Sequence, residues 1–212
     1  MGKKLESTML NMVLSLTLVC IVTSGLLATT YMFTSGPIAE SEALALKEAV
    51  KAVAPEFDND PINDSYKFET EDGYELLVYP AQKNGELVGA AVESSSKNGF
   101  SGLIRIIVGF DTEGKILNYS VLQHNETPGL GSKMQEWFRT DKNNQNIIGR
   151  SLANGNLAVT KDGGDVDAIT ASTISSRAFL ETINRAYNAY KGIDATTSAT
   201  AQNTEKGETP NE

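Results

Sequence analysis

A long apolar run near the N-terminus dominates the hydropathy pattern of the chain. Residues 9–33, MLNMVLSLTLVCIVTSGLLATTYMF, contain no charged side chain. A helix of about 20 apolar residues is long enough to cross the hydrocarbon core of a bilayer. The run therefore predicts a single transmembrane helix over residues 9–33, preceded by a short segment, residues 1–8.

A cleaved signal peptide is the alternative interpretation of this run. The apolar core of a signal peptide is only about 7–15 residues long, so the length favours an uncleaved anchor. Lys3 and Lys4 precede the run, whereas the flank after it, TSGPIAESEA, has no positive charge. Because Lys and Arg collect on the cytoplasmic side, we expect a single-pass membrane protein with its N-terminus in the cytoplasm and residues 34–191 outside.

Helical and strand patterns follow the apolar run. Gly36–Pro37 predicts a break, and a second helix is expected from Glu42 to about Ala54. Short segments rich in β-branched or aromatic residues predict four strands, at residues 74–79, 87–93, 103–110 and 116–123. The turn-forming sequences KNGE and DTEGK separate two pairs of these segments, so neighbouring strands should be antiparallel.

The remaining patterns complete an α+β domain over residues 34–191, an antiparallel sheet flanked by helices. We predict a short helix over residues 132–138, a strand over residues 156–161, and a last helix from near Ser172 to about Tyr190 with one apolar face. From Asp194 onward the chain has no large apolar residue, so residues 192–212 are expected to form a disordered acidic tail.

Composition and charge narrow the possible functions. The net charge is −9, and nucleic-acid binding needs clustered Lys and Arg, so we expect no nucleic-acid partner. The chain has one cysteine, Cys20, and one histidine, His124. These counts exclude an intramolecular disulfide and sites built from several Cys or His ligands, and we expect no resident metal.

Hydroxyl side chains cluster where the last helix is expected to begin, in DAITASTISS, residues 167–176. The simplest interpretation is that Thr170 or Ser172 caps the free N–H groups of the helix. The same N–H groups and the helix dipole also attract phosphate. A hydroxyl in this stretch could therefore also carry a phosphate group, whereas a catalytic hydroxyl would need a base that the nearby sequence does not provide.

Two stretches together resemble the FMN-binding domain family of membrane electron-transport complexes. HNETPGLG, residues 124–131, resembles the family signature H-x-E-T-P-G-L-G, and DAITASTISS resembles its flavinylation motif, D-x-x-[ST]-G-A-[ST]-x-[ST]-S. GFSGLIRIIVGFDTEGKI is similar to the family's central hairpin. In this alignment Thr173 is the modified hydroxyl, and Ala171–Ser172 replace the usual Gly–Ala pair.

The resemblance implies a cofactor and a set of residues. FMN would be linked to Thr173 as a phosphoester, made by a separate flavin transferase that reads Asp167, and no residue of the chain would be catalytic. Further candidate contacts with the flavin or its phosphate are Ser172, Thr170, Glu126, Thr127, Gly129, Leu130 and Lys133.

The resemblance also implies a place in a larger assembly. Members of this size with one anchor are the G subunit of the Rnf complex and the usually longer C subunit of the sodium-pumping NADH:quinone reductase, so length favours the Rnf type. Such a subunit would relay electrons beside other membrane subunits in an ion-translocating ferredoxin:NAD oxidoreductase of the bacterial inner membrane, with no independent activity. A membrane-anchored module that binds a phosphorylated ligand and a structural partner of a membrane complex are the alternatives.

Overall fold

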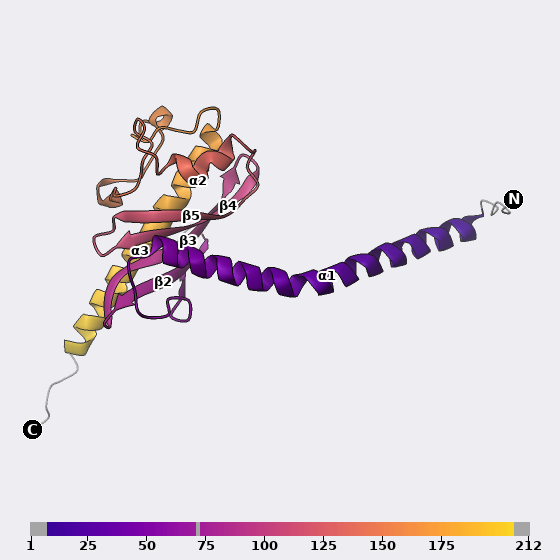
Figure 1. Ribbon diagram of the computed structural model, residues 1–212, viewed down its shortest axis with the longest axis horizontal. Helices are drawn as coiled ribbons and strands as arrows, with labels where there is room; N and C mark the ends of the chain where they lie inside the picture. Colours follow the sequence, from indigo (N-terminus) through magenta and orange to yellow (C-terminus); the bar gives the residue numbers. More distant parts are fainter. Residues whose placement is uncertain (1–7, 71–72, 206–212) are drawn as a thin grey trace, which may run out of the picture. The chain divides into compact units, whose positions relative to one another are not determined.

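The computed structural model describes residues 8–70 and 73–205 of the 212-residue chain. Residues 1–7 of the expected cytoplasmic segment and residues 206–212 of the expected tail lie outside this description. The chain forms two compact units, residues 1–45 and residues 46–212, and Figure 1 labels the longer helices and strands.

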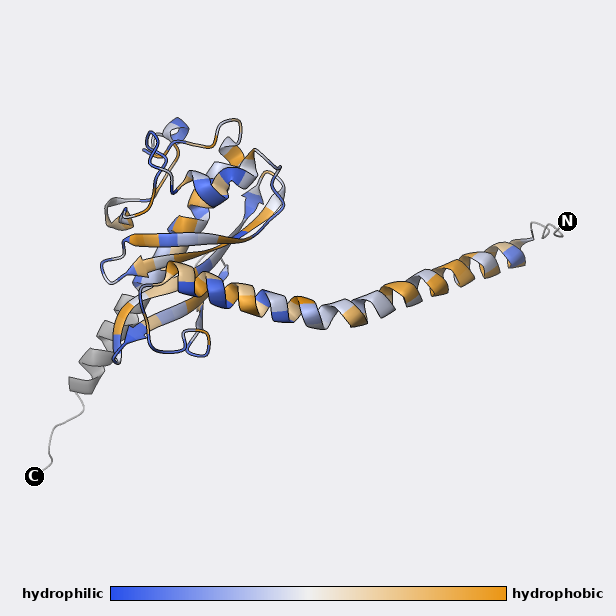
Figure 2. Cartoon of the chain, in the orientation of Figure 1, coloured by the Kyte–Doolittle hydropathy of each residue, from blue (hydrophilic) through white to orange (hydrophobic). Residues whose placement is uncertain are grey.

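Helix α1 (Met9–Val53) contains the expected membrane segment and is the one described helix that is long and apolar enough to cross a membrane. Figure 2 shows hydrophobic residues along its N-terminal part. The hydroxyls of Thr17, Thr23 and Thr29 each donate to the carbonyl four residues earlier. Because these polar groups are satisfied inside the helix, they are compatible with a lipid environment.

The predicted break at Gly36–Pro37 is wrong, since Pro37 lies inside the continuous helix α1. A proline removes one backbone hydrogen bond and bends a helix. The following sequence, IAESEALALKEA, is rich in residues with high helix propensity, so the helix continues beyond the proline and also includes the second helix that was predicted from Glu42.

Five antiparallel strands form one sheet in the order β1-β2-β3-β4-β5. They are β1 (Tyr66–Glu69), β2 (Glu75–Lys83), β3 (Glu86–Gly99), β4 (Gly102–Asp111) and β5 (Ile116–His124). The four predicted strands and the α+β class are confirmed. Asn84 and Gly85 both have positive φ in the β2–β3 turn, as a tight hairpin requires. Strand β1 was not predicted, because it is a short and mostly exposed edge strand.

The sheet buries both of its faces, as the alternation of side chains along each strand requires. One face packs against α3 (Thr173–Glu205), which lies behind the strands in Figure 1 and contributes Phe179 and Ile183 to the larger core. Val50 and Val53, from the end of α1, pack on the other face with Tyr79 and other residues.

Short helices and irregular segments connect β5 to α3. The predicted helix over residues 132–138 is confirmed as η1 (Gly131–Lys133) followed by α2 (Met134–Trp137). After η2 (Leu152–Asn154), the predicted strand over residues 156–161 is wrong. Val159 alone pairs with Val166, and η3 (Thr160–Asp162) follows at once. The turn at Gly163 brings the chain back beside Val159 too soon for a longer strand. Helix α3 begins near the predicted position and continues past Tyr190.

Candidate functional site

A pocket of about 320 Å³ brings the two sequence motifs together at the start of α3. Glu126, Thr127, Leu130 and Gly131 line it from the turn after β5, and residues 171–175 line it from the beginning of α3. Phe100, in the turn between β3 and β4, completes the wall. About 40 residues separate the motifs along the chain, so the fold creates this site.

The first turn of α3 presents free backbone donors. The N–H of Ser176 donates to the carbonyl of Ser172 across 3.0 Å, which is the first hydrogen bond of the helix. The preceding N–H groups of Thr173, Ile174 and Ser175 therefore have no acceptor within the helix. This helix end carries partial positive charge and suits an anionic group.

Lys161 adds a full positive charge beside Thr173. Its Nζ donates to Thr173 Oγ1 across 3.3 Å, from η3 to the first residue of α3. The Thr173 hydroxyl thus lies next to both an ammonium group and a helix N-terminus. A phosphate on this oxygen would meet two sources of positive charge.

Glu126 is 5% exposed and joins three segments around the pocket. Its Oε2 accepts from Ser175 Oγ at 2.7 Å, and its Oε1 accepts from the N–H of Ser101 at 3.1 Å. A side chain at Gly131 would place Cβ 2.6 Å from Glu126 Oε2 and 2.7 Å from Ser175 Oγ, so a larger residue there would displace this hydrogen-bonded pair. Glu126 therefore positions protein segments, with both carboxylate oxygens already accepting protein hydrogen bonds.

Ala171 has a left-handed backbone, with φ +61. This region costs a residue with Cβ about 1–2 kcal/mol, whereas glycine enters it freely. Position 171 is where the family motif usually has glycine. The structure gives a physical reason for that preference, because the backbone takes a left-handed conformation at residue 171, just before α3 begins.

The other residues singled out in the sequence fall into two groups. Ser172, Thr127 and Leu130 line the pocket, whereas Thr170, Gly129 and Lys133 do not. Gly129 has φ +75 and donates its N–H to Ser132 Oγ at 2.9 Å, which shapes the turn. Lys133 is exposed.

Asp167 and His124 have structural contacts in the same region. The carboxylate of Asp167 accepts from the N–H of Asn144 at 3.1 Å, and its carbonyl accepts from Trp137 Nε1 at 2.9 Å. The imidazole Nδ1 of His124 accepts from the N–H of Glu126 at 3.2 Å. Each residue fixes a segment that borders the site.

Sequence reasoning did not identify Lys161 or Phe100 as site residues. Lys161 lies in the KDGG turn that precedes the hydroxyl-rich stretch DAITASTISS, and Phe100 lies in the GFSG sequence at the start of the β3–β4 hairpin. Both sequences predict turns, but neither predicts a position in the fold. Only the folded chain shows that these two side chains border the site around Thr173.

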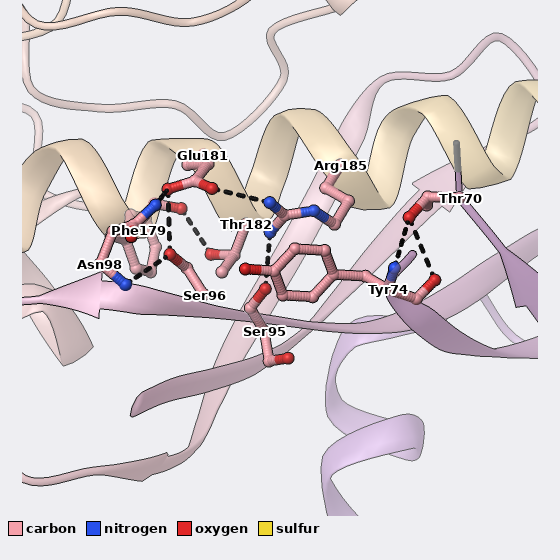
Figure 3. Close-up of polar contacts among 9 residues, drawn as sticks. All are labelled: Thr70, Tyr74, Ser95, Ser96, Asn98, Phe179, Glu181, Thr182 and Arg185. Atoms are coloured by element: carbon pink, nitrogen blue, oxygen red, sulfur yellow. Dashed lines mark hydrogen bonds and ion pairs between the residues drawn. The ribbon is translucent and has the colours of Figure 1, made fainter. Parts of the chain in front are cut away.

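A larger cleft of about 880 Å³ lies farther along α3, beside β1 and residues 156–159. Its two arginines are already paired. Arg177 binds Asp162 at 2.6 and 2.7 Å. Figure 3 shows the second pair, in which Arg185 binds Glu181 at 2.7 Å. Both positive charges of this cleft are therefore already neutralised by carboxylates. We place the candidate site in the smaller pocket, because both motifs and the open helix end converge there.

Comparison with known proteins gives matches over nearly the whole chain. Residues 99–188 match the FMN-binding domain family model, and residues 1–53 match the RnfG N-terminal region. The chain is 35% identical over 184 residues to the G subunit of the ion-translocating oxidoreductase complex of Photorhabdus laumondii, covering 81% of this chain and 85% of that protein. It is 34% identical over 196 residues to the corresponding protein of Aliivibrio fischeri, covering 87% and 91%.

Proposed function

The chain belongs to the family of G subunits of ion-translocating oxidoreductase complexes, with an FMN-binding domain, and from this membership we propose that it relays electrons within a membrane-bound complex of the Rnf type. In this proposal the complex transfers electrons between ferredoxin and NAD, and the chain contributes FMN bound as a phosphoester to Thr173. The observation that carries the proposal is the position of Thr173, which lines the pocket beside Lys161 at the start of α3.

The residues around Thr173 fit FMN. Lys161 and the free N–H groups of α3 suit the phosphate, and the polar side chains of Thr127 and Ser172 suit the ribityl hydroxyls. Leu130 and Ile174 add exposed apolar surface for the ring. The volume of about 320 Å³ lies at the low end of the range for ligand pockets, about 300–1,000 Å³. A pocket of this size would enclose a flavin only in part.

The proposed attachment forms one bond and breaks one. Thr173 Oγ1 forms a P–O bond with the FMN phosphorus of FAD, the pyrophosphate bond breaks, and AMP leaves. The hydroxyl proton passes to a base of the separate flavin transferase, which uses its own magnesium, and nothing is oxidised or reduced. Asp167 belongs to the sequence that this transferase reads.

The bound flavin would supply reversible electron transfer, and the chain would hold and orient it. Lys161 neutralises the phosphate, Glu126 fixes the surrounding segments, and α1 anchors the domain in the membrane. Lys3 and Lys4 favour a cytoplasmic N-terminus and an extracytoplasmic flavin domain. In that location a covalent bond prevents loss of a soluble cofactor.

Mass spectrometry tests the proposal directly. The full chain is produced together with an active flavin transferase, and the peptide from Asp167 to Arg177 is analysed. We expect a mass increment equal to FMN less water, and a fluorescent band after denaturing electrophoresis. A colourless protein with an unmodified peptide would overturn the redox proposal and favour a phosphoryl-ligand module or a structural partner of the complex.

A further inference from the structure

Phe100 is unusually exposed for a large apolar side chain. Among the described residues of the second unit, the exposed large apolar side chains are Tyr66, Phe100, Leu130 and Ile174. Three of these four line the pocket beside Thr173, and Phe100 is the most exposed, at 69%. Apolar surface gathered at one site indicates a place where something else packs.

The turn that carries Phe100 is fixed on both sides. After it, the N–H of Ser101 donates to Glu126 at 3.1 Å. Before it, Ser96 Oγ and Asn98 Nδ2 both donate to Glu181 Oε2 at 2.9 Å (Figure 3). An exposed phenyl ring thus stands on a turn that two carboxylates hold in place.

Arg185 strengthens the second of these supports. Its Nη2 donates to Glu181 at 2.7 Å, and its Nη1 donates to the carbonyl of Ser95 at 2.6 Å (Figure 3). Its guanidinium also lies over the ring of Tyr74, 3.8 Å from the centroid. The end of β3 is therefore tied to α3, the same helix that begins with Thr173.

Two glycines keep the turn narrow. Gly99 pairs with Gly102 across the hairpin, and Gly102 has φ +99. A Cβ at Gly99 would lie 2.7 Å from Glu126 Oε1 and would also clash with the carbonyl of Gly102. Any larger residue at position 99 would push the turn away from Glu126, so the glycine keeps Phe100 at the pocket.

We propose that Phe100 packs on the isoalloxazine ring of the flavin attached to Thr173 and shields it from solvent. This inference rests on the proposed function, because the attachment point determines which occupant reaches the patch. The phosphate end of FMN would be fixed at Thr173, and the ribityl chain would carry the ring onto the adjacent apolar wall. An aromatic side chain and a flat aromatic ring have complementary stacking geometry. Asn98 acts as a positioning residue, through the turn.

Replacement of Phe100 by tryptophan gives a direct test. An indole in contact with a flavin quenches its fluorescence by electron transfer, which requires close approach. Full-length Phe100→Trp, produced with flavin transferase, should retain covalent FMN by mass spectrometry and lose flavin fluorescence several-fold relative to the wild type. Unchanged fluorescence in a fully flavinylated variant would overturn the inference.

Tyr66→Trp is the matched control, since Tyr66 is also an exposed aromatic residue. Strand β1 lies beside α3 at Gly192, where Phe68 is the neighbour. Gly192 is about 28 Å along the helix from Thr173, at about 1.5 Å per residue. The control should leave flavin fluorescence unchanged, and equal quenching by both variants would also overturn the inference. Wild-type protein without covalent FMN would instead contradict the proposed function itself.

Iodide quenching separates shielding from a general structural effect. Phe100→Ala should increase the quenching of the attached flavin by iodide about two-fold or more. Asn98→Ala should increase iodide quenching in the wild-type background. It should have little further effect in Phe100→Ala, because Asn98 acts only through the position of the phenyl ring. If Asn98→Ala has the same effect in both backgrounds, or Phe100→Ala has none, Phe100 does not cover the ring.

Discussion

Lys161 donates a hydrogen bond from Nζ to Thr173 Oγ1 across 3.3 Å. The pair joins η3, which follows Val159, to the first residue of α3. The ammonium group of Lys161 thus lies beside the hydroxyl that we propose carries the cofactor. Neither residue is unusual by type in an exposed turn or a helix start. Their contact distinguishes Thr173 from the other hydroxyls of the motif.

Thr173→Ala should abolish the fluorescent flavin band while the protein remains folded. The residue is only partly buried, and its hydroxyl hydrogen-bonds to Lys161 at the surface, so removal costs little stability. Thr170→Ala is the control, because Thr170 is exposed and outside the pocket lining, and its band should persist. A band retained in Thr173→Ala would identify another hydroxyl as the acceptor.

Lys161→Gln should slow flavinylation without preventing it. An exposed charged contact is worth about 0.5–1 kcal/mol, which corresponds to roughly a two- to five-fold lower rate. The measurement is the increase in in-gel fluorescence with time, with the transferase in fixed amount. Lys133→Gln removes an exposed lysine outside the pocket and should match the wild type. A stronger effect of Lys133→Gln would assign the phosphate to that side chain instead.

Ala171→Gly should leave flavinylation equal or higher and stabilise the protein slightly. Relief of the left-handed backbone contributes about 1–2 kcal/mol, and the greater freedom of glycine in the unfolded chain opposes it by about 0.4–1 kcal/mol. The net gain is roughly 0.8 kcal/mol, visible as a small rise in Tm. Ala168→Gly, at a position without positive φ, should lower Tm. Reduced flavinylation in Ala171→Gly would count against this account.

Glu126→Ala should destabilise the domain by about 2–3 kcal/mol, because it leaves two buried or partly buried donors, from Ser175 and Ser101, without an acceptor. Thermal unfolding in detergent measures the effect. Glu136→Ala removes an exposed carboxylate from α2 and should shift Tm little. Comparable losses in both variants would show that Glu126 does not hold the three segments together.

The support of the Phe100 turn should weaken in acid. Burial raises the pKa of Glu181, but hydrogen bonds from Asn98, Arg185 and Ser96 outweigh it and hold the pKa below the ordinary value of 4.5. The unfolded chain therefore binds this proton at higher pH than the folded domain. The resulting stability is fully present above about pH 5.5 and is lost as pH falls through the lowered pKa.

Glu181→Gln tests this pH dependence. In the variant, Tm should fall less steeply than in the wild type between about pH 5 and pH 3, although the variant starts from a lower Tm. Glu136→Gln, which replaces an exposed carboxylate, should keep the wild-type slope. Parallel curves for Glu181→Gln and the wild type would show that this carboxylate does not contribute to the acid sensitivity.

Local patterns predicted the elements that local physics determines. The four longer strands, the short helix after β5 and the start of α3 follow from alternation, turn residues and the helical spacing of apolar residues. Strand β1 could not be recognised from YKFE alone, because its pairing with β2 defines it. The strand predicted at residues 156–161 is wrong because this segment has no partner strand. Its apolar residues pack into the core, and only Val159 forms an isolated bridge, to Val166.

At the site, too, local sequence predicted some features, and others depend on the tertiary fold. The two motifs predicted that the turn after β5 and the start of α3 share a ligand, and both segments line one pocket. Lys161 and Phe100 come from separate turns, and their approach to the site depends on the paths of η3 and the β3–β4 hairpin. Asp167 was assigned to recognition by another protein, and no sequence pattern indicated that its carboxylate also holds Asn144.

The end of α1 determines where the chain can be cut. Val50 and Val53 are buried against the sheet, and Gly109 of β4 has no side chain because the carbonyl of Val53 occupies that space. Removing these two valines would expose apolar surface worth about 1.5–3 kcal/mol for each. A water-soluble version of the flavin domain should therefore begin at or before Leu46, inside the helix, and not after Pro55. The anchor and the domain share one continuous helix, so its last turns also serve as part of the redox domain's core.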